Sequence, residues 1–462
     1  MTPAAAERLA VLVHGVQPAA LPPAVVAHAK ALILDSIGCM LGGLGAGVAA
    51  GVRGAAARLG GTPEATVIGT GLRTSCTLAA FANGTALRYL DSNDYYFGRD
   101  PAHPSGALPV ALALAERDGR SGAELIAALV AGYEVHLRLA DGAGAPSLWA
   151  RGWHHSTNLA IAVAALAGRL LQDDAEVTAH AIAIAATHCN TLAQLQSGGI
   201  ATIKATAEAF TAKTALVAAL LAQHGVTGPL AVLEGEAGWV RAVAGQADLE
   251  ALCAPFGGDW KLPRTCIKPY AAVATAMAPV QAALDLFHQD GVRADRIAAV
   301  TVKLPRFPLG TPSAHPGRRF PQTRESADHS FYFCVAIALL DGACGEAQFG
   351  LDRLQDPALR ALLEKLELAE DAALTAGWPA AGGAVAVTLD DGRVLERRHA
   401  FPPGHPDNPL PPAALHAKFL DHALPVIGPA RAKAVIAAVA DLDRCPDIGS
   451  LMSLLSAPEG MP

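Results

Sequence analysis

The sequence has few charged and few aromatic residues for its length of 462 residues. Charged residues make up 17% and aromatic residues 5%, against 52% hydrophobic residues, which is typical of a folded, helix-leaning protein rather than a disordered chain. The formal net charge is −7, with 35 basic and 42 acidic residues and no run of Lys or Arg. These features argue against a nucleic-acid groove or an anionic membrane surface as partner, whereas a small anionic substrate needs only a few well-placed cations.

The motifs of metal-dependent, nucleotide-binding and serine-hydrolase chemistry are missing. The sequence contains no HExxH motif, Walker A loop, GxSxG elbow or strand-linked GxGxxG motif, and its eight cysteines form no CxxC pair. We therefore expect neither a metal ion nor a cofactor. Scattered cysteines, and an N-terminus without a basic segment followed by an apolar one, favour a reduced, cytoplasmic protein.

Long uninterrupted hydrophobic runs are also scarce, although the mean hydropathy is positive, at +0.31. Two long uncharged runs span residues 36–52 and 214–233. The first is rich in glycine, and the second contains Gln223, His224 and Pro229. Neither is a convincing stretch of about 20 continuous apolar residues, so we predict buried helices and turns, and no membrane partner.

Helical periodicity dominates the chain up to about residue 260. Ser121 and Glu124 form a capping-box pattern at the start of one helix. Apolar residues recur at helical spacing in 158–171 and 175–188, and an Ala-rich helix follows over 205–223. Because Ala-dense helices pack closely, we predict a compact all-α domain in this half.

The character of the sequence changes after about residue 260. A predicted helix over 271–288 leads to residues 296–305, whose alternation and β-branched residues predict an antiparallel strand. Residues 384–400 form the clearest hairpin of the chain, with Asp390-Asp391-Gly392 at its turn. A further helix is predicted over 330–342, so this part of the chain is expected to form a smaller α+β domain.

The C-terminal segment returns to helix after the Pro-rich loop 401–412. Two helices are predicted there, over 413–424 and 428–440. In the simplest architecture, this C-terminal segment packs against the first helical domain, which makes the α+β unit an insertion. The predicted fold is mainly α with an inserted α+β domain: an all-helical domain from residues 1–264 and 402–462, and a smaller α+β domain from 265–401.

Ionisable residues gather in a short stretch of otherwise apolar sequence. Asp91 and Asp94 are followed closely by His103, with Pro104 and Ser105 next to it. Burying such residues is costly unless they find partners, so their clustering indicates a functional site. The alternative is an exposed loop between helices, in which Asp and Ser cap helix ends.

Other candidate residues stand near predicted helix starts. His154 and His155 precede a helix, and because neighbouring residues point about 100° apart, at most one of them is expected to face a site. Lys204, at a loop–helix junction, and Lys268, at the start of the second domain, either hold a carboxylate or extend to solvent. His329 stands at a helix N-terminus, a position that capping by its neighbours explains equally well.

Taken together, these residues resemble the MmgE/PrpD family, and the likeness covers nearly the whole chain. Its landmarks occur here in order as LDSND (90–94), HPSG (103–106), GYEV (132–135), GWH (152–154), SGG…K (197–204), EG (234–235), KPY (268–270), ADHSF (327–331), LLDG (339–342) and GHPDNPL (404–410). The family includes 2-methylcitrate dehydratases, cis-aconitate decarboxylases and iminodisuccinate epimerases. The resemblance implies a helical domain built from both chain ends, an inserted α+β lid, and a homodimer.

The resemblance also implies a set of site residues. The expected catalytic residues are Asp91, His103, His154 and Lys204. The expected substrate-binding residues are Lys268, Asp94, Tyr95, Ser105 and Tyr332. The sequence departs from the family pattern where Tyr95 replaces a frequent Thr, where Phe333 replaces a frequent Tyr, where residues 271–277 lack a His, and where Ala207 and Ala209 replace a frequent His and Gly.

A lyase that acts on a polycarboxylate needs cations for the carboxylates, a base for the departing proton and an acid for the departing hydroxide. Lys204 and Lys268 can supply the cations, while His103, His154 and Asp91 can carry or orient protons. We therefore expect a cofactor-independent dehydratase of the 2-methylcitrate type, acting on a hydroxylated di- or tricarboxylate. The alternatives are a cis-aconitate-type decarboxylase or an iminodisuccinate-type epimerase and, from another class, a family member that binds polycarboxylates without turning them over.

Overall fold

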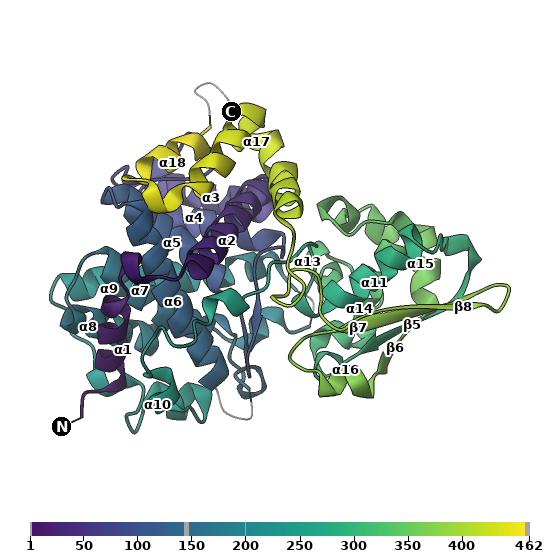
Figure 1. Ribbon diagram of the computed structural model, residues 1–462, viewed down its shortest axis with the longest axis horizontal. Helices are drawn as coiled ribbons and strands as arrows, with labels where there is room; N and C mark the ends of the chain where they lie inside the picture. The colour runs from purple at the N-terminus through teal and green to yellow at the C-terminus, as the bar shows by residue number, and fades with distance from the viewer. Residues whose placement is uncertain (1, 143–146, 199, 458–462) are drawn as a thin grey trace.

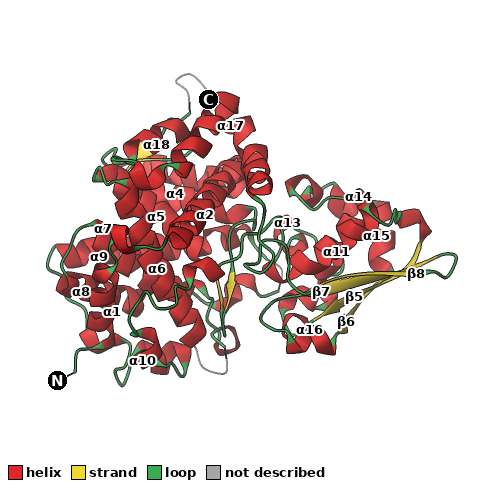
Figure 2. Cartoon of the chain, in the orientation of Figure 1, coloured by secondary structure: helices red, strands yellow, loops and turns green. Residues whose placement is uncertain are grey.

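The computed structural model describes residues 2–142, 147–198 and 200–457, and it shows a mainly helical protein with a small mixed sheet in its C-terminal part (Figure 2). The larger unit, here called the helical domain, contains α1 (Ala5–Gly15), α2 (Pro23–Gly42), α3 (Gly47–Leu59), α4 (Cys76–Tyr89), α5 (Leu108–Arg117), α6 (Gly122–Gly142), α7 (Ser156–Leu170), α8 (Ala175–His188), α9 (Ala207–Gln223), α10 (Leu249–Leu252), α17 (Pro412–Ala440) and α18 (Gly449–Leu455). The smaller unit, here called the lid, contains α11 (Met277–His288), α12 (Arg306–Leu309), α13 (Arg324–Ala327), α14 (Phe331–Asp341), α15 (Pro357–Glu364), α16 (Ala372–Ala376) and the strands β5 (Ile297–Leu304), β6 (Leu366–Glu370), β7 (Gly383–Leu389) and β8 (Val394–His399).

The helix starts follow from local capping chemistry. At the start of α6, the Ser121 hydroxyl accepts a hydrogen bond from the Glu124 amide at 3.2 Å, while the Glu124 carboxylate accepts one from the Ser121 amide at 2.9 Å. This reciprocal pair is the predicted capping box, and it satisfies two amides that the helix itself cannot. Helix α8 begins in the same manner, because the Asp174 carboxylate accepts from the Val177 amide at 2.8 Å. The predicted helix over 175–188 is therefore confirmed residue for residue.

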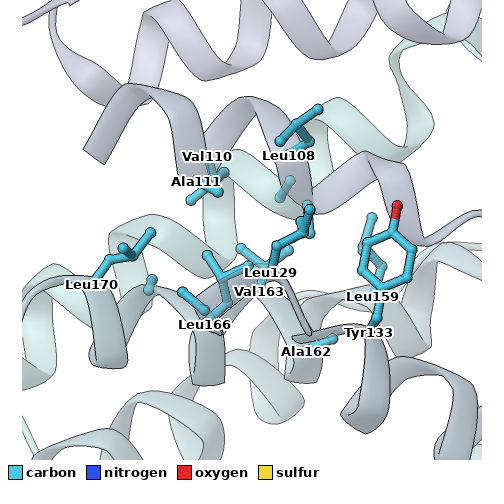
Figure 3. Close-up of a cluster of buried hydrophobic side chains, with 14 of the residues drawn as sticks. Leu108, Val110, Ala111, Leu129, Tyr133, Leu159, Ala162, Val163, Leu166 and Leu170 are labelled. Carbon is cyan, nitrogen blue, oxygen red and sulfur yellow. The ribbon is translucent and has the colours of Figure 1, made fainter. Parts of the chain in front are cut away.

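The core of the helical domain contains residues from both ends of the chain. Helix α17 packs against α2, and in Figure 1 the C-terminal helices, in yellow, lie beside the purple N-terminal ones. The helix break predicted between 424 and 428 appears inside α17 as a kink at Gly428, whose φ is +72°. Figure 3 shows a central part of this core, where leucines, valines and alanines of α5, α6 and α7 meet, with the ring of Tyr133 at one side of the cluster. The return of the C-terminal tail to the first domain is thus confirmed.

Three helical stretches of the described chain are long and apolar enough to cross a membrane, judged by length and composition alone: Pro23–Gly45, Thr202–Gln223 and Pro412–Ala440. The prediction from uncharged runs missed them because it stopped at each charged residue. In the first two, 67% of the apolar window is buried inside the domain, and in the third 28% is buried.

The lid is built on a four-stranded sheet with the order β6-β5-β7-β8. The predicted hairpin is confirmed, since β7 and β8 pair antiparallel with Val385 opposite Arg397. Strand β5 is also confirmed and pairs antiparallel with β7, but on its other side it pairs parallel with β6, which places Val302 opposite Leu368. The sheet is therefore mixed, and sequence reasoning missed β6 because its five residues show only a weak alternation of burial. Helix α11 packs against β7 and β8, and α14 contacts β6 (Figure 1).

The two units have separate hydrophobic cores, and one residue of the first half belongs to the second core. The larger core includes residues from Ala5 to Ile267 and from Leu415 to Leu455. The smaller includes residues from Cys266 to Leu389, together with Tyr95. Tyr95 reaches it because its amide and carbonyl both bond to Cys266, at 3.0 and 2.8 Å. The division agrees with a lid inserted into a helical domain, while the boundaries at 264/265 and 401/402 stay predictions.

Candidate active site

A cavity of about 460 Å³ lies between the helical domain and the lid. Its ionisable lining from the helical domain comes from α4, from the loop after it and from the start of α7, and consists of Arg88, Asp91, Asp100, His103 and His155. The ionisable lining from the lid consists of Arg306, Arg318 and His329. Pockets of this size hold small organic ligands, and they occur preferentially at domain interfaces. Of the nine predicted site residues, Asp91 and His103 lie on the wall of this cavity.

Asp91 is the centre of a buried ionic cluster. Its backbone has a φ of +51°, which directs the carboxylate from the end of α4 into the gap between the domains. The carboxylate accepts hydrogen bonds from Lys204 Nζ at 3.0 Å and from Lys268 Nζ at 2.8 Å, and the Arg88 guanidinium lies 3.3 Å away. Burial alone would raise the pKa of Asp91, but the Lys204, Lys268, His329 and Arg88 charges hold it well below its usual range. Asp91 is therefore ionised at neutral pH.

The two predicted lysines lie behind Asp91 rather than on the cavity wall. The Lys204 side chain is 1% exposed and that of Lys268 is fully buried, so the alternative in which they extend to solvent is wrong. Lys268 donates a second bond, at 2.7 Å, to the Asp91 carbonyl. Burial lowers the pKa of Lys268 to about 8, against the opposing effect of Asp91. In this arrangement the lysines fix and neutralise Asp91, and their predicted direct contact with substrate carboxylates stays a prediction.

His103 is held by its Nδ1 atom and presents Nε2 to the cavity. Its Nδ1–H donates to the Asp94 carbonyl at 2.6 Å, and because a carbonyl can only accept, this bond places the neutral ring's proton on Nδ1. Nε2 then carries the lone pair on the cavity side. Burial, followed by the Arg88, Lys268 and His155 charges, lowers the pKa of His103 well below its usual value. His103 is thus neutral at neutral pH and suited to exchange a proton through Nε2.

Asp94 orients the loop that carries His103 but lies outside the cavity wall. Its carboxylate accepts from the Ser105 amide at 3.2 Å, from the Ser105 hydroxyl, and from Tyr133 Oη at 2.8 Å. Tyr133 reaches it from the helical core, with its hydroxyl as the polar tip of an apolar cluster (Figure 3). Burial raises the pKa of Asp94 to about 6, although these donors oppose the rise. Asp94 and Ser105, both predicted to bind substrate, are placed as residues that position His103.

His154 and His155 are adjacent residues just before α7, and their spacing predicts that at most one of them faces the site. One member of the pair lies on the cavity wall. That member is His155, whereas the predicted His154 lies behind it, with ring centroids 3.9 Å apart. His155 Nε2 lies 3.0 Å from a Glu208 carboxylate oxygen, and His155 meets His103 edge to face with centroids 5.0 Å apart. Burial alone would raise the pKa of Glu208, but Arg88 and the two histidines hold it well below its usual range. The Glu208 carboxylate therefore accepts a hydrogen bond from His155 Nε2–H.

Five further ionisable residues of the wall are absent from the predicted site set, and of these only His329 was weighed as a candidate. Arg88 contacts Glu208 at 3.1 Å as well as Asp91, and its signal was an arginine three residues before an aspartate in an apolar helix. His329 bonds through Nδ1 to Asp328, and its Nε2 lies 4.0 Å from Asp91. Burial, ahead of the Lys204 charge, lowers the pKa of His329. The remaining three are Asp100, whose pKa burial raises to about 6, and Arg306 and Arg318 of the lid.

The predicted tyrosine contacts lie away from the cavity. Tyr95 is buried in the lid core beside Cys266, and burial raises the pKa of its phenol well above the usual value. Tyr332 donates to the Ala314 carbonyl at 3.3 Å, beneath the Arg319 guanidinium. Phe333 stacks in the same lid core near Phe349. Gly199 of the predicted Gly-rich loop lies outside the described residues, and within the described part no group of three or more His, Cys, Asp or Glu side chains is arranged to hold a metal ion.

The sequence matches one family over both domains. Residues 7–252 match the MmgE/PrpD N-terminal domain and residues 270–444 match the MmgE/PrpD C-terminal domain, so the chain belongs to the MmgE/PrpD family. It is 28% identical to a cis-aconitate decarboxylase of Homo sapiens, over 98% of this chain and 94% of that protein. It is 26% identical to the cis-aconitate decarboxylase-like protein oryM of Aspergillus oryzae, over 95% of each chain. A mitochondrial 2-methylcitrate dehydratase of Yarrowia lipolytica is 25% identical, over 82% of this chain and 76% of that protein.

Proposed function

We propose that this protein is a decarboxylase of a cis-aconitate-type tricarboxylate. The sequence alone favours dehydration as the main reaction and decarboxylation as an alternative, and the proposal reverses this order. The observation that carries the proposal is His103, anchored through Nδ1 and facing an inter-domain cavity lined by cationic side chains. The whole-length similarity to cis-aconitate decarboxylases supports the choice, because the 2-methylcitrate dehydratases align over a smaller share of the chain.

The reaction needs anion binding and one proton. When CO2 leaves the saturated methylene of the substrate, the electron pair of the broken C–C bond forms a new C=C bond. The pair of the former C=C bond then takes a proton at the far carbon. Arg88 and the neighbouring wall histidines lower the energy of the charge that spreads toward the remaining carboxylates. His103 Nε2 is the proton donor in this proposal.

The lowered pKa of His103 suits a proton donor once the substrate is bound. A polyanionic substrate raises the pKa of nearby imidazoles, so that His103 takes up a proton as the cavity fills. An imidazolium that burial and cationic neighbours disfavour then gives its proton up readily. Asp94 and Ser105 keep the ring in one orientation during this exchange.

Dehydration of a 2-methylcitrate-type substrate is the second candidate, because burial and cationic neighbours favour a neutral His103 and the pKa of Asp100 is raised to about 6. A neutral His103 would take the proton from carbon, and an acid such as Asp100 would protonate the departing hydroxide. The two candidates require opposite starting states of His103. Decarboxylation should therefore slow as the pH rises above the pKa of the complex, whereas dehydration should slow as the pH falls below it.

The test is incubation of the purified protein with cis-aconitate and with 2-methylcitrate in D2O, followed by NMR. We expect cis-aconitate to yield CO2 and a product with one solvent deuteron on the new methylene. His103→Asn should lower this turnover by about 10²–10⁴-fold, whereas His224→Asn, at the exposed end of α9, should not change it. Loss of water from 2-methylcitrate without CO2 release from cis-aconitate would replace the proposal with the second candidate.

A further inference from the structure

The cavity has an ionic end and an apolar end. Asp91, His103 and His329 mark the ionic end, whereas Phe97 and Phe307 belong to an aromatic part of the wall. Apolar atoms make up most of the exposed lining of the cavity as a whole. The unsubstituted tricarboxylate of the proposed reaction offers no apolar surface to such a wall.

The apolar end is a built aromatic wall that spans the two domains. Phe97 comes from the helical domain, Phe307 comes from the lid, and Trp378 packs against both, with ring centroids 5.1 and 4.5 Å away. Phe97 sits on β3 (Tyr96–Phe97), which pairs antiparallel with β4 (Pro101–Ala102), and Phe97 lies opposite Pro101. Since His103 directly follows β4, the same small ribbon carries both the wall and the proton-exchanging residue.

The two arginines of the lid that line the cavity already have partners within the protein. Arg318 donates to the Gln196 and Gly198 carbonyls, at 3.2 Å each, across the domain interface. Arg306 pairs with Glu370 at 3.1 Å. An alkyl group at this end leaves these bonds in place and removes aromatic surface from water.

We infer that the substrate is a polycarboxylate carrying an alkyl chain of several carbons, whose carboxylates occupy the ionic end while the chain lies against Phe97 and Phe307, with which Trp378 packs. This inference rests on the proposed function for the placement of the carboxylates. These aromatic residues determine specificity rather than catalysis.

Binding of unreactive analogues tests the inference without turnover. Propane-1,2,3-tricarboxylate and its 2-alkyl derivatives have neither a hydroxyl to eliminate nor a double bond to accept electrons, so calorimetric titration of the full chain reports affinity alone. We expect the Kd to fall by roughly threefold to fourfold for each added methylene until the wall is covered. Affinity that stays constant or weakens along the series overturns the inference.

Matched variants locate the effect. Phe307 is 41% exposed, so Phe307→Ala should fold normally; it should reduce the gain per methylene and leave the affinity of the unsubstituted acid unchanged. Phe401→Ala, at a residue of similar exposure (38%) outside the cavity, should leave the whole series unchanged. An undiminished gain in Phe307→Ala overturns the inference. If binding depends on chain length but no unsaturated or hydroxylated counterpart is turned over, the inference holds and the proposed function is wrong. If cis-aconitate is turned over but affinity does not change with chain length, the proposed function holds and the inference is wrong.

Discussion

Replacing Asp91 with asparagine should strongly destabilise the protein. Asn keeps the shape of the side chain and tolerates the positive φ of 51°, so the backbone is not the cause of the expected effect. The substitution removes the only carboxylate that Lys204 and Lys268 contact among the described residues, and leaves both ammonium groups buried. Breaking a buried ion pair by removing one partner costs about 3–5 kcal/mol, and we expect a loss of unfolding free energy in this range at pH 7.

The pH dependence of this loss follows from Lys268. Its folded-state pKa of about 8 lies below its unfolded value, so the unfolded chain binds more protons between these pH values, and stability rises with pH across that window. Without the Asp91 charge, which raises the Lys268 pKa, the window opens at a lower pH. The cost of Asp91→Asn should therefore shrink, by roughly 1 kcal/mol, between pH 7 and pH 9.

Guanidinium unfolding at the two pH values measures both effects. Adding Lys268→Met to Asp91→Asn should recover part of the lost stability, because the unpaired charge is then removed as well. Asp390→Asn breaks an exposed pair with Arg296 and should change stability little, which makes it the control. A cost below about 1 kcal/mol, an equal cost at both pH values, or additive losses in the double variant would refute the buried-cluster argument.

Three further substitutions probe the supports of the site. Tyr133→Phe removes a hydrogen-bond donor from the buried Asp94 carboxylate and should lower the unfolding free energy by about 1–3 kcal/mol at pH 7.5. The loss should be smaller at pH 5, because a pKa of about 6 leaves Asp94 largely protonated there. Unfolding measurements that give an equal loss at both pH values would exclude this role of Tyr133. Lys204→Met should lower turnover by about two orders of magnitude and also lower the melting temperature, since this lysine is buried; a stable variant would contradict the ion pair with Asp91. Lys418→Met leaves Asp35 without its cation and the Ser92 and Lys268 carbonyls without the hydrogen bonds from Lys418, so stability and turnover should both fall. The control Lys433→Met, on the exposed face of the same helix, should leave both unchanged.

Local signals in the sequence were sufficient for most of the architecture. The Ser121 and Glu124 pair, the helical periodicity of 175–188 and the turn at residues 390–392 each act over a few residues, and the structure contains all three features. Strand β6 was missed because its partner β5 is more than sixty residues away and a parallel pairing leaves no turn signal between them.

Only part of the candidate site could be predicted from the sequence. Residue type and motif order identified Asp91 and His103, but not the direction in which each neighbouring side chain points. His155, which directly precedes the start of α7 at Ser156, lines the cavity and His154 does not; the spacing of the pair predicts that at most one faces the site but not which one. The depth of Lys204 and Lys268 follows from the packing of the lid against α4, which a sequence does not reveal.

Decarboxylation and dehydration of related tricarboxylates make nearly the same demands on this cavity. Both move an electron pair past a carboxylate, so both benefit from Arg88 and the ionised cluster around Asp91. They differ in whether His103 begins charged or neutral. Since buried cations favour the neutral ring and a bound polyanion favours the charged one, the charge of the substrate itself sets the starting state. A change of reaction within such a cavity therefore requires a different starting state of His103 more than a different proton-exchanging residue.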